Sequence, residues 1–389
     1  MTREPVRLLL VLTENQTLVE ERDLRRIARH LRPKAWLTLV QWRDARPDLL
    51  AAKLAVDKFA CGLSSSRVQA TTTMHVELEE RLASWFGFES CLLFTTGYQA
   101  MVGTIMAFAD NLSHACILDG TFLSAGTPGR QPEVRFFNHN SAKSLDRVLR
   151  TRERKNAMVL FEGIYSLDGD EANIREMVAV AEKHENTVLV CDDAHGTGTL
   201  GRGGRGILEK YSLYGKVPVV VSTFSKSFGG IGGILLGTRD VVDHVKHTAR
   251  SFLFSATLPA PIVAAASTIL DMLEADGEGL VAELHEKAAY MRKNLLDIGF
   301  DLGDSNTHIM PVMCKDERKA LFMHIALLES GVMMVPITYP GVKKGEERLR
   351  VNITRGHSYE DMDKALELLK TYGEAFFVLS GEELAPMED

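Results

Sequence analysis

Residues 217–233 read VPVVVSTFSKSFGGIGG, an apolar run followed by small hydroxyl residues, a lysine and a glycine-rich turn. A short, nearly continuous apolar run is typical of a strand buried on both faces of a parallel sheet. The lysine, Lys226, should therefore lie beyond the carboxyl end of a strand, where open α/β sheets bind their ligands. A nucleotide-binding P-loop carries its glycines before the lysine, and here they follow it.

Three further apolar runs have the same form and are each followed by polar residues: CLLF (91–94), AMVLF (157–161) and TVLVC (187–191). The segment 170–186 has a helical pattern and separates the second run from the third, which indicates a βαβ unit. We therefore predict an α/β fold whose large domain contains a parallel sheet. The polar residues after these strands should converge on one edge of that sheet.

The sequence changes character near residue 285, where helical stretches alternate with a second set of apolar segments: HIMPVMC (308–314), GVMMVPITYP (331–340) and RLRVNIT (348–354). This arrangement indicates a smaller α+β domain. We predict an N-terminal helical segment over 1–50, with an amphipathic helix at 16–32. A large domain over 51–285 and a small C-terminal domain over 286–389 should follow.

The bulk composition excludes several classes of protein. The chain has 389 residues, is 45% hydrophobic and has a formal net charge of −7, which fits a globular protein and gives no sign of nucleic-acid binding. Its five cysteines form no CxxC pair, so we expect no metal site and a reducing compartment. The run LLLVL (8–12) is too short for a membrane span or a signal-peptide core, and we expect a cytoplasmic protein.

The surroundings of Lys226 point to pyridoxal phosphate (PLP). A lysine at a random position is most often a surface residue, but here Ser222, Thr223 and Ser225 precede it at the end of a strand. A partly desolvated lysine amine can form a Schiff base with an aldehyde. Nearby hydroxyl and backbone N–H groups can hold a phosphate. PLP carries both an aldehyde and a phosphate.

The stretch VCDDAHGTGTLGRGGRG (190–206) supplies groups that the PLP ring would need. The pyridine nitrogen needs a carboxylate partner if the ring is to act as an electron sink. Asp192 follows a strand directly, and His195 lies three residues further on, where it can reach the phenolic oxygen of the ring. A solvated loop acid and an ordinary turn histidine are the alternatives for these two residues taken alone.

Three other places complete the candidate site. LSHACILDG (112–120) offers His114 to stack on the ring. TTGYQA (95–100) opens a helix, where a phosphate is favoured. In ERLRVNITRGH (347–357), Arg350 points to the opposite face from the alternating apolar residues, and a bidentate arginine is the usual partner of a substrate carboxylate. An edge-strand surface arginine is the alternative reading.

Together these stretches resemble the α-oxoamine synthases, a family of fold-type-I PLP-dependent enzymes. That family includes 8-amino-7-oxononanoate synthase, 2-amino-3-ketobutyrate CoA ligase, serine palmitoyltransferase and 5-aminolevulinate synthase. The matching runs follow the family's order over roughly residues 60–360 and include FEGIYSLDGDEANI (161–174), FLFSATLPAP (252–261) and VPITYPGVKKGEERLRVNIT (335–354). The resemblance implies a large domain with a mostly parallel sheet of the seven-stranded type, and a smaller C-terminal α+β domain.

The resemblance also implies a role for each matching residue. Lys226 is similar to the Schiff-base lysine that moves protons at Cα, Asp192 to the partner of the pyridine nitrogen and His195 to the partner of the ring oxygen. His114 matches the stacking histidine, and Arg350 matches the arginine that takes the substrate carboxylate. The remaining matches imply contacts near the cofactor, its phosphate or the substrate: Thr96, Gly97, Tyr98, Glu162, Ser166 and Thr223.

Ser255 and Thr257 match a segment that reaches the phosphate of the neighbouring subunit, which implies a homodimer with shared active sites. Two stretches depart from the family pattern. LTLVQWRDARPDLL (37–50) lacks the usual Asn-Tyr-Leu-Gly segment, and GLSSSR (62–67) replaces the usual GSGGSR. These departures affect the approaches to the site, and therefore the choice of substrate.

The activity implied is the condensation of a small amino acid with an acyl thioester, which releases carbon dioxide and a thiol and gives an α-amino ketone. We favour an activity like that of 8-amino-7-oxononanoate synthase, while TFSKSFGGIGG resembles the serine palmitoyltransferases more closely. A 2-amino-3-ketobutyrate CoA ligase-like activity also stays open, as do the amino acid and the thiol carrier, CoA or a carrier protein. The rivals of another class are a PLP-dependent aminotransferase or aldolase, and a non-catalytic scaffold.

Overall fold

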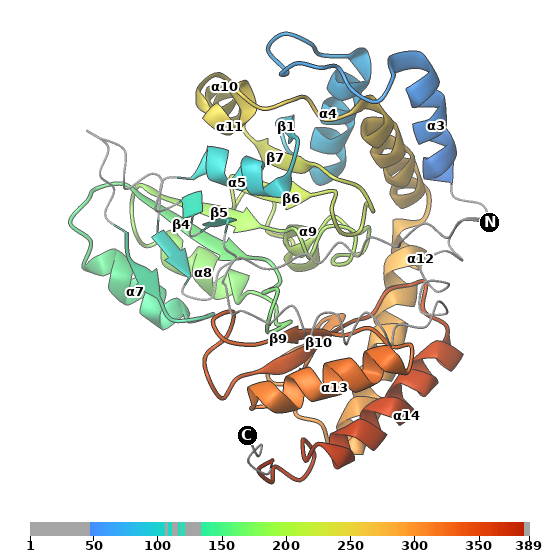
Figure 1. Cartoon of the computed structure of the whole chain (residues 1–389). Helices are drawn as coiled ribbons and strands as arrows, with labels where there is room; N and C mark the ends of the chain where they lie inside the picture. Colours follow the sequence, from blue (N-terminus) through green and yellow to red (C-terminus); the bar gives the residue numbers. More distant parts are fainter. Residues whose placement is uncertain (1–46, 106–107, 111–115, 118, 121–133, 385–389) are drawn as a thin grey trace.

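The computed structural model describes residues 47–384, apart from 106–107, 111–115, 118 and 121–133 (Figure 1). The predicted helix at 16–32 and the candidate His114 therefore lie outside the described residues. So does most of the atypical stretch at 37–50.

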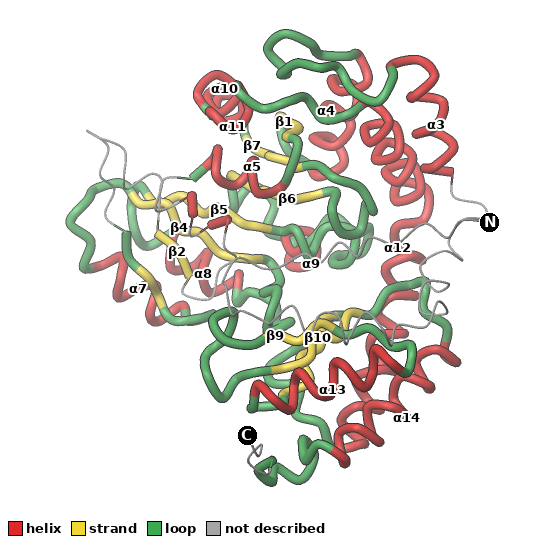
Figure 2. Tube along the Cα trace, viewed as in Figure 1, coloured by secondary structure: helices red, strands yellow, loops and turns green. Residues whose placement is uncertain are grey.

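A seven-stranded sheet forms the centre of the large domain, as the family resemblance implies (Figure 2). Its strand order is β1-β7-β6-β5-β4-β2-β3, and only β7 runs antiparallel to its neighbours. The strands are β1 (Ser90–Phe94), β2 (Phe108–Asp110), β3 (Phe136–Phe137), β4 (Ala157–Glu162), β5 (Thr187–Asp192), β6 (Val219–Thr223) and β7 (Gly233–Gly237). Every residue of β6 and β7 is buried, because helices cover both faces of the sheet.

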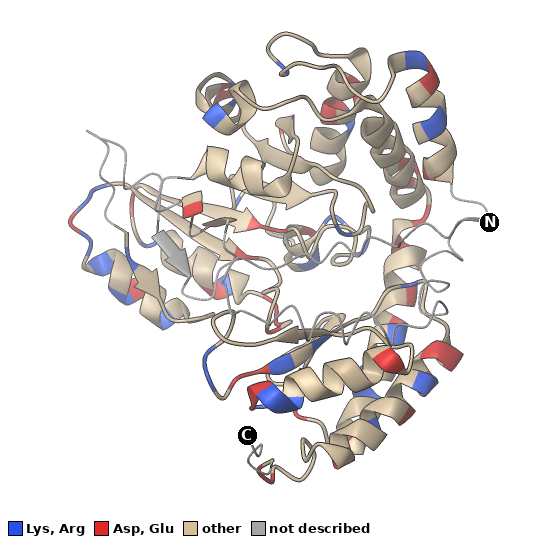
Figure 3. Cartoon of the chain, in the orientation of Figure 1, with Lys and Arg blue, Asp and Glu red and all other residues tan. Residues whose placement is uncertain are grey.

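The described helices of this part of the chain are α3 (Pro47–Phe59), α4 (Thr73–Phe86), α5 (Gly97–Thr104), α7 (Ala142–Arg150), α8 (Ile174–Ala181), α9 (Ile207–Tyr211), α10 (Arg239–Thr248) and α11 (Arg250–Leu253). The βαβ unit predicted around 170–186 is present as β4-α8-β5, with a helix shorter than the sequence pattern suggested. Figure 3 shows basic and acidic residues close together along α7, where Asp146 pairs with Arg150.

The helix α12 (Ala260–Ile298) runs from the large domain into the small one (Figure 1). It is kinked at Asp276, whose φ of −150° and ψ of 44° are not helical. At the kink, Gly277 packs against the backbone of Gly203, and a Cβ on Gly277 would come within 2.5 Å of the Gly203 carbonyl oxygen. The predicted domain boundary at 285/286 falls inside this helix and stays an interpretation.

The C-terminal part has its own hydrophobic core, which takes in residues from Leu284 onward. Its three-stranded antiparallel sheet has the order β8-β10-β9, and two helices pack beside it. The elements are β8 (Ile309–Met313), α13 (Glu317–Glu329), β9 (Val335–Ile337), β10 (Arg348–Asn352) and α14 (Tyr359–Ala375). Among the residues described, no helix is both long and apolar enough to cross a membrane.

Candidate active site

Polar residues end three neighbouring parallel strands at one edge of the large sheet. Glu162 ends β4 and lies beside Asp192, which ends β5. Asp192 in turn lies beside Val221, two residues before Thr223 ends β6. The turn that follows β6 carries Lys226. The convergence expected from the apolar runs is therefore present, because parallel strands share the edge at which they end.

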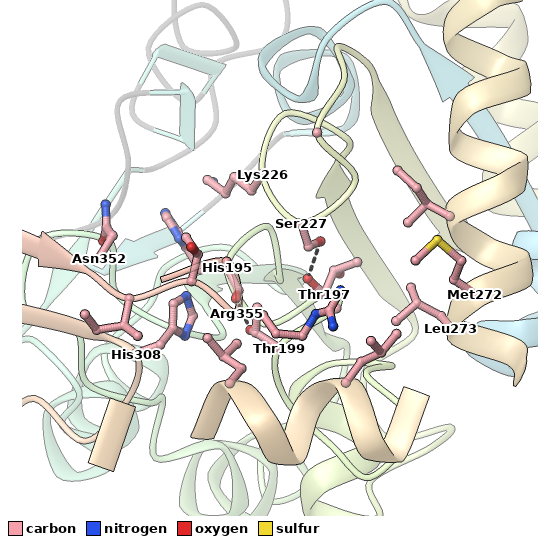
Figure 4. Close-up of a pocket in the computed structure, with 18 of the residues that line it drawn as sticks. His195, Thr197, Thr199, Lys226, Ser227, Met272, Leu273, His308, Asn352 and Arg355 are labelled. Carbon is pink, nitrogen blue, oxygen red and sulfur yellow. Dashed lines mark hydrogen bonds between the residues drawn. The ribbon is translucent and has the colours of Figure 1, made fainter. Parts of the chain in front are cut away.

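Lys226 projects into an open cavity (Figure 4), so its side chain is accessible although protein surrounds it on several sides. Burial lowers the pKa of the Lys226 amine, and the carboxylates of Asp192 and Glu162 raise it in partial compensation. The neighbouring Ser227 donates a hydrogen bond of 2.7 Å to the Thr197 carbonyl oxygen, which fixes the turn against the loop after β5. The Lys226 amine thus lies within the electrostatic influence of two carboxylates.

The Asp192 carboxylate is buried and has a defined orientation. Its Oδ1 accepts a hydrogen bond of 3.1 Å from the backbone N–H of Ala194. The Cys116 thiol lies 3.7 Å from Oδ2 and donates to it. Burial raises the pKa of the Cys116 thiol well above its ordinary value, and the Asp192 charge adds to this effect. The thiol therefore stays protonated and remains a donor.

The next residue, Asp193, is buried among glycines. Its Oδ2 accepts a hydrogen bond of 2.9 Å from the Ile207 N–H. A Cβ added to Gly163, Gly196 or Gly206 would overlap the Asp193 carboxylate. Burial raises the pKa of Asp193 to about 8. These residues form the Asp193 cradle, and it explains the glycines at positions 163, 196 and 206.

The start of α5 packs against the end of β6. Thr96 caps the helix, and its hydroxyl accepts a hydrogen bond of 3.1 Å from the Gln99 N–H. A Cβ on Gly97 would lie 2.9 Å from the Thr223 Cβ, so only glycine allows this approach. Thr223 donates a hydrogen bond of 2.7 Å to the Gly232 carbonyl oxygen. Free N–H groups at a helix N-terminus, with hydroxyls nearby, favour an anion such as a phosphate.

Tyr98, on the same turn of α5, is exposed and donates a hydrogen bond of 2.9 Å to Asp119 Oδ2. Ser166 is buried, and its backbone N–H donates to Glu162 Oε2 over 3.3 Å. The turn after β4 thereby orients the Glu162 carboxylate toward the interior of the site.

Ser255 and Thr257 make their described contacts within this chain. Ser255 accepts a hydrogen bond of 2.9 Å from the Gln99 side chain. The buried Thr257 hydroxyl donates to the Ser65 carbonyl oxygen over 2.7 Å. Thr257 thus secures the atypical GLSSSR loop (62–67). Contact of Ser255 and Thr257 with a neighbouring subunit's phosphate stays a prediction.

Arg350 lies in the middle of β10 and faces the same cavity as Lys226. Burial lowers the pKa of its guanidinium, and Glu162 partly compensates. Its Nε has no hydrogen-bond partner within the described part of the chain. A buried guanidinium N–H without a partner is costly unless a ligand completes its hydrogen bond. A carboxylate is the ligand that suits it.

The cavity has a volume of about 970 Å³ and lies between the two domains (Figure 4). Lys226, His195 and Arg350 line it, together with His308 from the segment before β8. Burial, with smaller effects of the nearby His285 and Arg350, lowers the pKa of His308 to about 4, so His308 is neutral at physiological pH.

Sequence reasoning missed three residues near this site: Cys116, His308 and Arg348. Arg348 is buried and forms an ion pair of 2.7 Å with Asp168, which ties β10 to the turn after β4. Its spacing of two from Arg350 places both on the same face of the strand, a signal that could have revealed it. A single cysteine and a single histidine carried no comparable signal.

The chain is similar to several known proteins over most of its length. The family model for class I and II aminotransferases matches residues 39–369. The 8-amino-7-oxononanoate synthase of Thermoanaerobacter pseudethanolicus is 35% identical over 85% of this chain and 84% of its own length. The serine palmitoyltransferase of Bacteriovorax stolpii is 35% identical over 82% of this chain and 76% of its own length.

A solved serine palmitoyltransferase of Sphingomonas wittichii superposes with a TM-score of 0.80 and 32% identity, covering 86% of this chain and 85% of that one. The chain therefore belongs to the class I and II aminotransferase family of α/β enzymes. Within it, these relatives identify the chain as an α-oxoamine synthase, an enzyme of the fold-type-I, PLP-dependent group. Another solved structure, of SPT with PLP, has a TM-score of 0.79, 33% identity and 85% coverage of both chains.

The described residues fit PLP as the cofactor. Lys226 offers an amine of lowered pKa for the aldehyde carbon. Asp192 offers a buried carboxylate held by two donors, one of which can yield to the pyridine nitrogen. The backbone N–H groups at the start of α5 offer donors of the kind that a phosphate needs.

Proposed function

We propose that the protein joins a small amino acid to an acyl thioester with loss of carbon dioxide and thiol, giving an α-amino ketone as 8-amino-7-oxononanoate synthase does. The observation that carries this proposal is Arg350, a half-buried guanidinium in the cavity that Lys226 enters, whose Nε has no partner among the described residues. An amino-acid substrate brings a carboxylate for Arg350 and a Cα proton for Lys226. Relatives named for this activity and for serine palmitoyltransferase both cover more than four fifths of the chain.

Each side chain has a task that its surroundings support. Two N–H groups of the Arg350 guanidinium bind the substrate carboxylate and orient the amino acid. Lys226 would hold the cofactor through its amine and would accept the Cα proton, a role that the lowered pKa of this amine favours. Asp192 holds the proton on the pyridine nitrogen. The PLP ring supplies an electron sink for the carbanion at Cα.

The other predicted residues have roles in binding the cofactor. His195 lies beside Lys226 on the cavity wall, where it can donate to the ring oxygen. Thr96, Gly97, Tyr98 and Thr223 contribute the phosphate end. Glu162 and Ser166 border the ring, and His114, outside the described residues, stacks on it.

We also infer a homodimer in which Ser255 and Thr257 approach the partner's phosphate. An exposed phenylalanine beside them, Phe254, supports an interface there, because it is 75% exposed in the single chain. The five free cysteines, four of them buried, support a reducing, cytoplasmic setting.

Purified protein supplied with PLP tests the proposal. Glycine, alanine, serine and threonine are titrated in turn while the visible absorbance of bound PLP is recorded. Thiol release from acyl-CoAs is then measured with a thiol-reactive dye, and the product is identified by mass spectrometry. We expect one amino acid to shift the absorbance saturably and to give thiol and α-amino ketone in equal amounts. Lys226→Ala should abolish both signals.

Two outcomes would point elsewhere. Formation of a keto acid without thiol release would identify an aminotransferase. Failure to retain PLP under any condition would favour a scaffold.

A further inference from the structure

The turn that follows β4, residues 165–171, is fixed to the large domain by two buried carboxylates, Asp170 and Glu171. Asp170 Oδ2 accepts a hydrogen bond of 2.8 Å from the side-chain amide of Asn140. Glu171 Oε2 accepts a hydrogen bond of 2.9 Å from the Tyr211 hydroxyl. Because both partners belong to the large domain, the turn keeps its place there whatever the small domain does.

The same turn contacts the small domain through Asp168 and Gly169. Arg348 Nη1 pairs with Asp168 Oδ1 over 2.7 Å. The Thr307 hydroxyl donates a hydrogen bond of 2.7 Å to the Gly169 carbonyl oxygen. Gly169 has a φ of +71°, and a Cβ at this position would overlap the Ile309 carbonyl oxygen at the start of β8. We name the four residues Asp168, Gly169, Thr307 and Arg348 the domain clasp.

The domain clasp includes the strand that carries Arg350. Arg348 and Arg350 lie two positions apart on β10, so both side chains leave the same face of the strand. Arg348 is buried, whereas Arg350 lines the cavity that Lys226 enters from the large domain. The distance between Arg350 and Lys226 therefore depends on how the small domain is held, and the clasp is a contact that holds it.

We propose that the domain clasp sets the amino-acid specificity of the site, by fixing Arg350 at the distance from Lys226 that suits a carboxylate on the carbon that bears the amine. This inference rests on the proposed function and deepens it, because it concerns which amino acids the site accepts. A β-amino acid carries its carboxylate one carbon further from its amine, which adds about 1.5 Å of bond length. A misplacement of about 1 Å can reduce productive binding by a factor of about 100.

Arg348 and Gly169 act through Arg350 and are positioning residues, because neither of them is among the described residues that line the cavity. Removal of the Arg348 guanidinium leaves the turn fastened to the large domain and frees the small domain to shift. Arg350 can then follow a carboxylate that lies further from the amine. Loss of the clasp should therefore weaken the preference for α-amino acids more than it weakens cofactor binding.

L-alanine and β-alanine test this, because they are isomers that differ in the distance between amine and carboxylate. Each is titrated into the PLP-loaded protein, and the saturable absorbance change of bound PLP gives its affinity. Wild-type protein should bind L-alanine about 100-fold more tightly than β-alanine. Arg348→Met should reduce this preference by a factor of about ten or more, while the affinity for PLP stays within about threefold of wild type.

Gly169→Ala tests the clasp without a change of charge. The added methyl group pushes against the Ile309 carbonyl oxygen and should reduce the preference by a similar factor. Gly303→Ala is the matched control, because Gly303 also lies in a loop with a positive φ, of +55°, but has no neighbouring atom within 4 Å of the position of the new Cβ. Its preference should stay within about twofold of wild type, since the change strains only the backbone.

Two milder variants separate positioning from loss of folding. Arg348→Lys keeps a cation opposite Asp168 and should restore the preference to within about threefold of wild type. Asp168→Asn changes a half-buried partner without changing its size and should reduce the preference about threefold or more. Circular dichroism and urea titration show that each variant is folded, and a general loss of stability would not by itself change the ratio of the two affinities.

An unchanged preference in folded, PLP-loaded Arg348→Met and Gly169→Ala proteins would overturn the inference. Equal binding of the two isomers by wild-type protein would overturn it as well. A failure of the proposed function has a different signature, because it would appear as no thiol release from any acyl thioester, and the ratio of the two affinities is measured without an acyl donor.

Discussion

Replacement of Arg350 is the most direct test of how the site recognises the carboxylate of its amino-acid substrate. Two charge-assisted hydrogen bonds join a guanidinium to a carboxylate, and each contributes about 1.5–3 kcal/mol. Arg350→Met removes both, so amino-acid affinity should fall by about 3–6 kcal/mol, which is a factor of at least about 150. Arg350→Lys keeps the charge but loses the two-pronged geometry, and affinity should fall by about tenfold or more.

The assay is the saturable absorbance change of bound PLP on titration with the amino acid that the wild-type protein accepts. Cofactor content should be unaffected, because Arg350 lies on β10 in the other domain from the Lys226 turn. Arg202→Met serves as the control, since Arg202 is exposed and pairs with Glu278 outside the cavity. An affinity within threefold of wild type for Arg350→Met would refute the assignment of the carboxylate to this residue.

Three further predictions concern the residues behind the site. Cys116→Val removes the thiol donor to Asp192, so it should weaken PLP binding about tenfold and alter the pH dependence of the absorbance of bound PLP. Cys116→Ser keeps a donor, and its affinity for PLP should stay within threefold of wild type. Equal behaviour of the two variants would show that the thiol does not position Asp192. Gly206 has a φ of +88° and lies against Asp193, so Gly206→Ala should lower the free energy of unfolding, measured by urea titration, by about 3 kcal/mol or more. Gly215 has a φ of +76° but open space around it, so Gly215→Ala should lower that free energy by only about 1–2 kcal/mol. Because the pKa of Asp193 rises from 3.8 to about 8 on folding, the folded state holds a proton that the unfolded state loses, so stability should fall as pH rises from about 4 to 8, with a slope of up to about 1.4 kcal/mol per pH unit. Asp193→Asn should flatten this slope, and an unchanged slope would mean that another group titrates.

The sequence predicted the centre of the fold well because its signals there are local. The valines before Ser222 could only be a buried strand, and β6 is buried at every position. Asp192, Lys226 and Arg350 were identifiable because each follows or occupies a strand whose direction the pattern revealed. The edge that Asp192 and Lys226 share follows from the parallel pairing of β5 and β6, whereas Arg350 reaches the cavity from the antiparallel sheet of the other domain.

What escaped prediction depends on contacts distant along the chain. The predicted domain boundary at 285/286 fell inside α12, because the loop that packs against its kink at Gly277 lies some 70 residues earlier in the chain. Cys116 gained meaning only when its thiol was seen beside Asp192, 76 residues away. The intrachain contact of Thr257 with Ser65 had no sequence signal either.

The Asp193 cradle has a consequence for how this sequence can diverge. Three glycines leave room for one carboxylate, so none of them can gain a side chain while Asp193 is present. Shortening Asp193 first would open that room but would leave the Ile207 N–H without its acceptor. Substitution is destabilising whether a glycine or Asp193 changes first, so the four positions do not change independently. Lineages that descend from this protein should keep or lose them as a block.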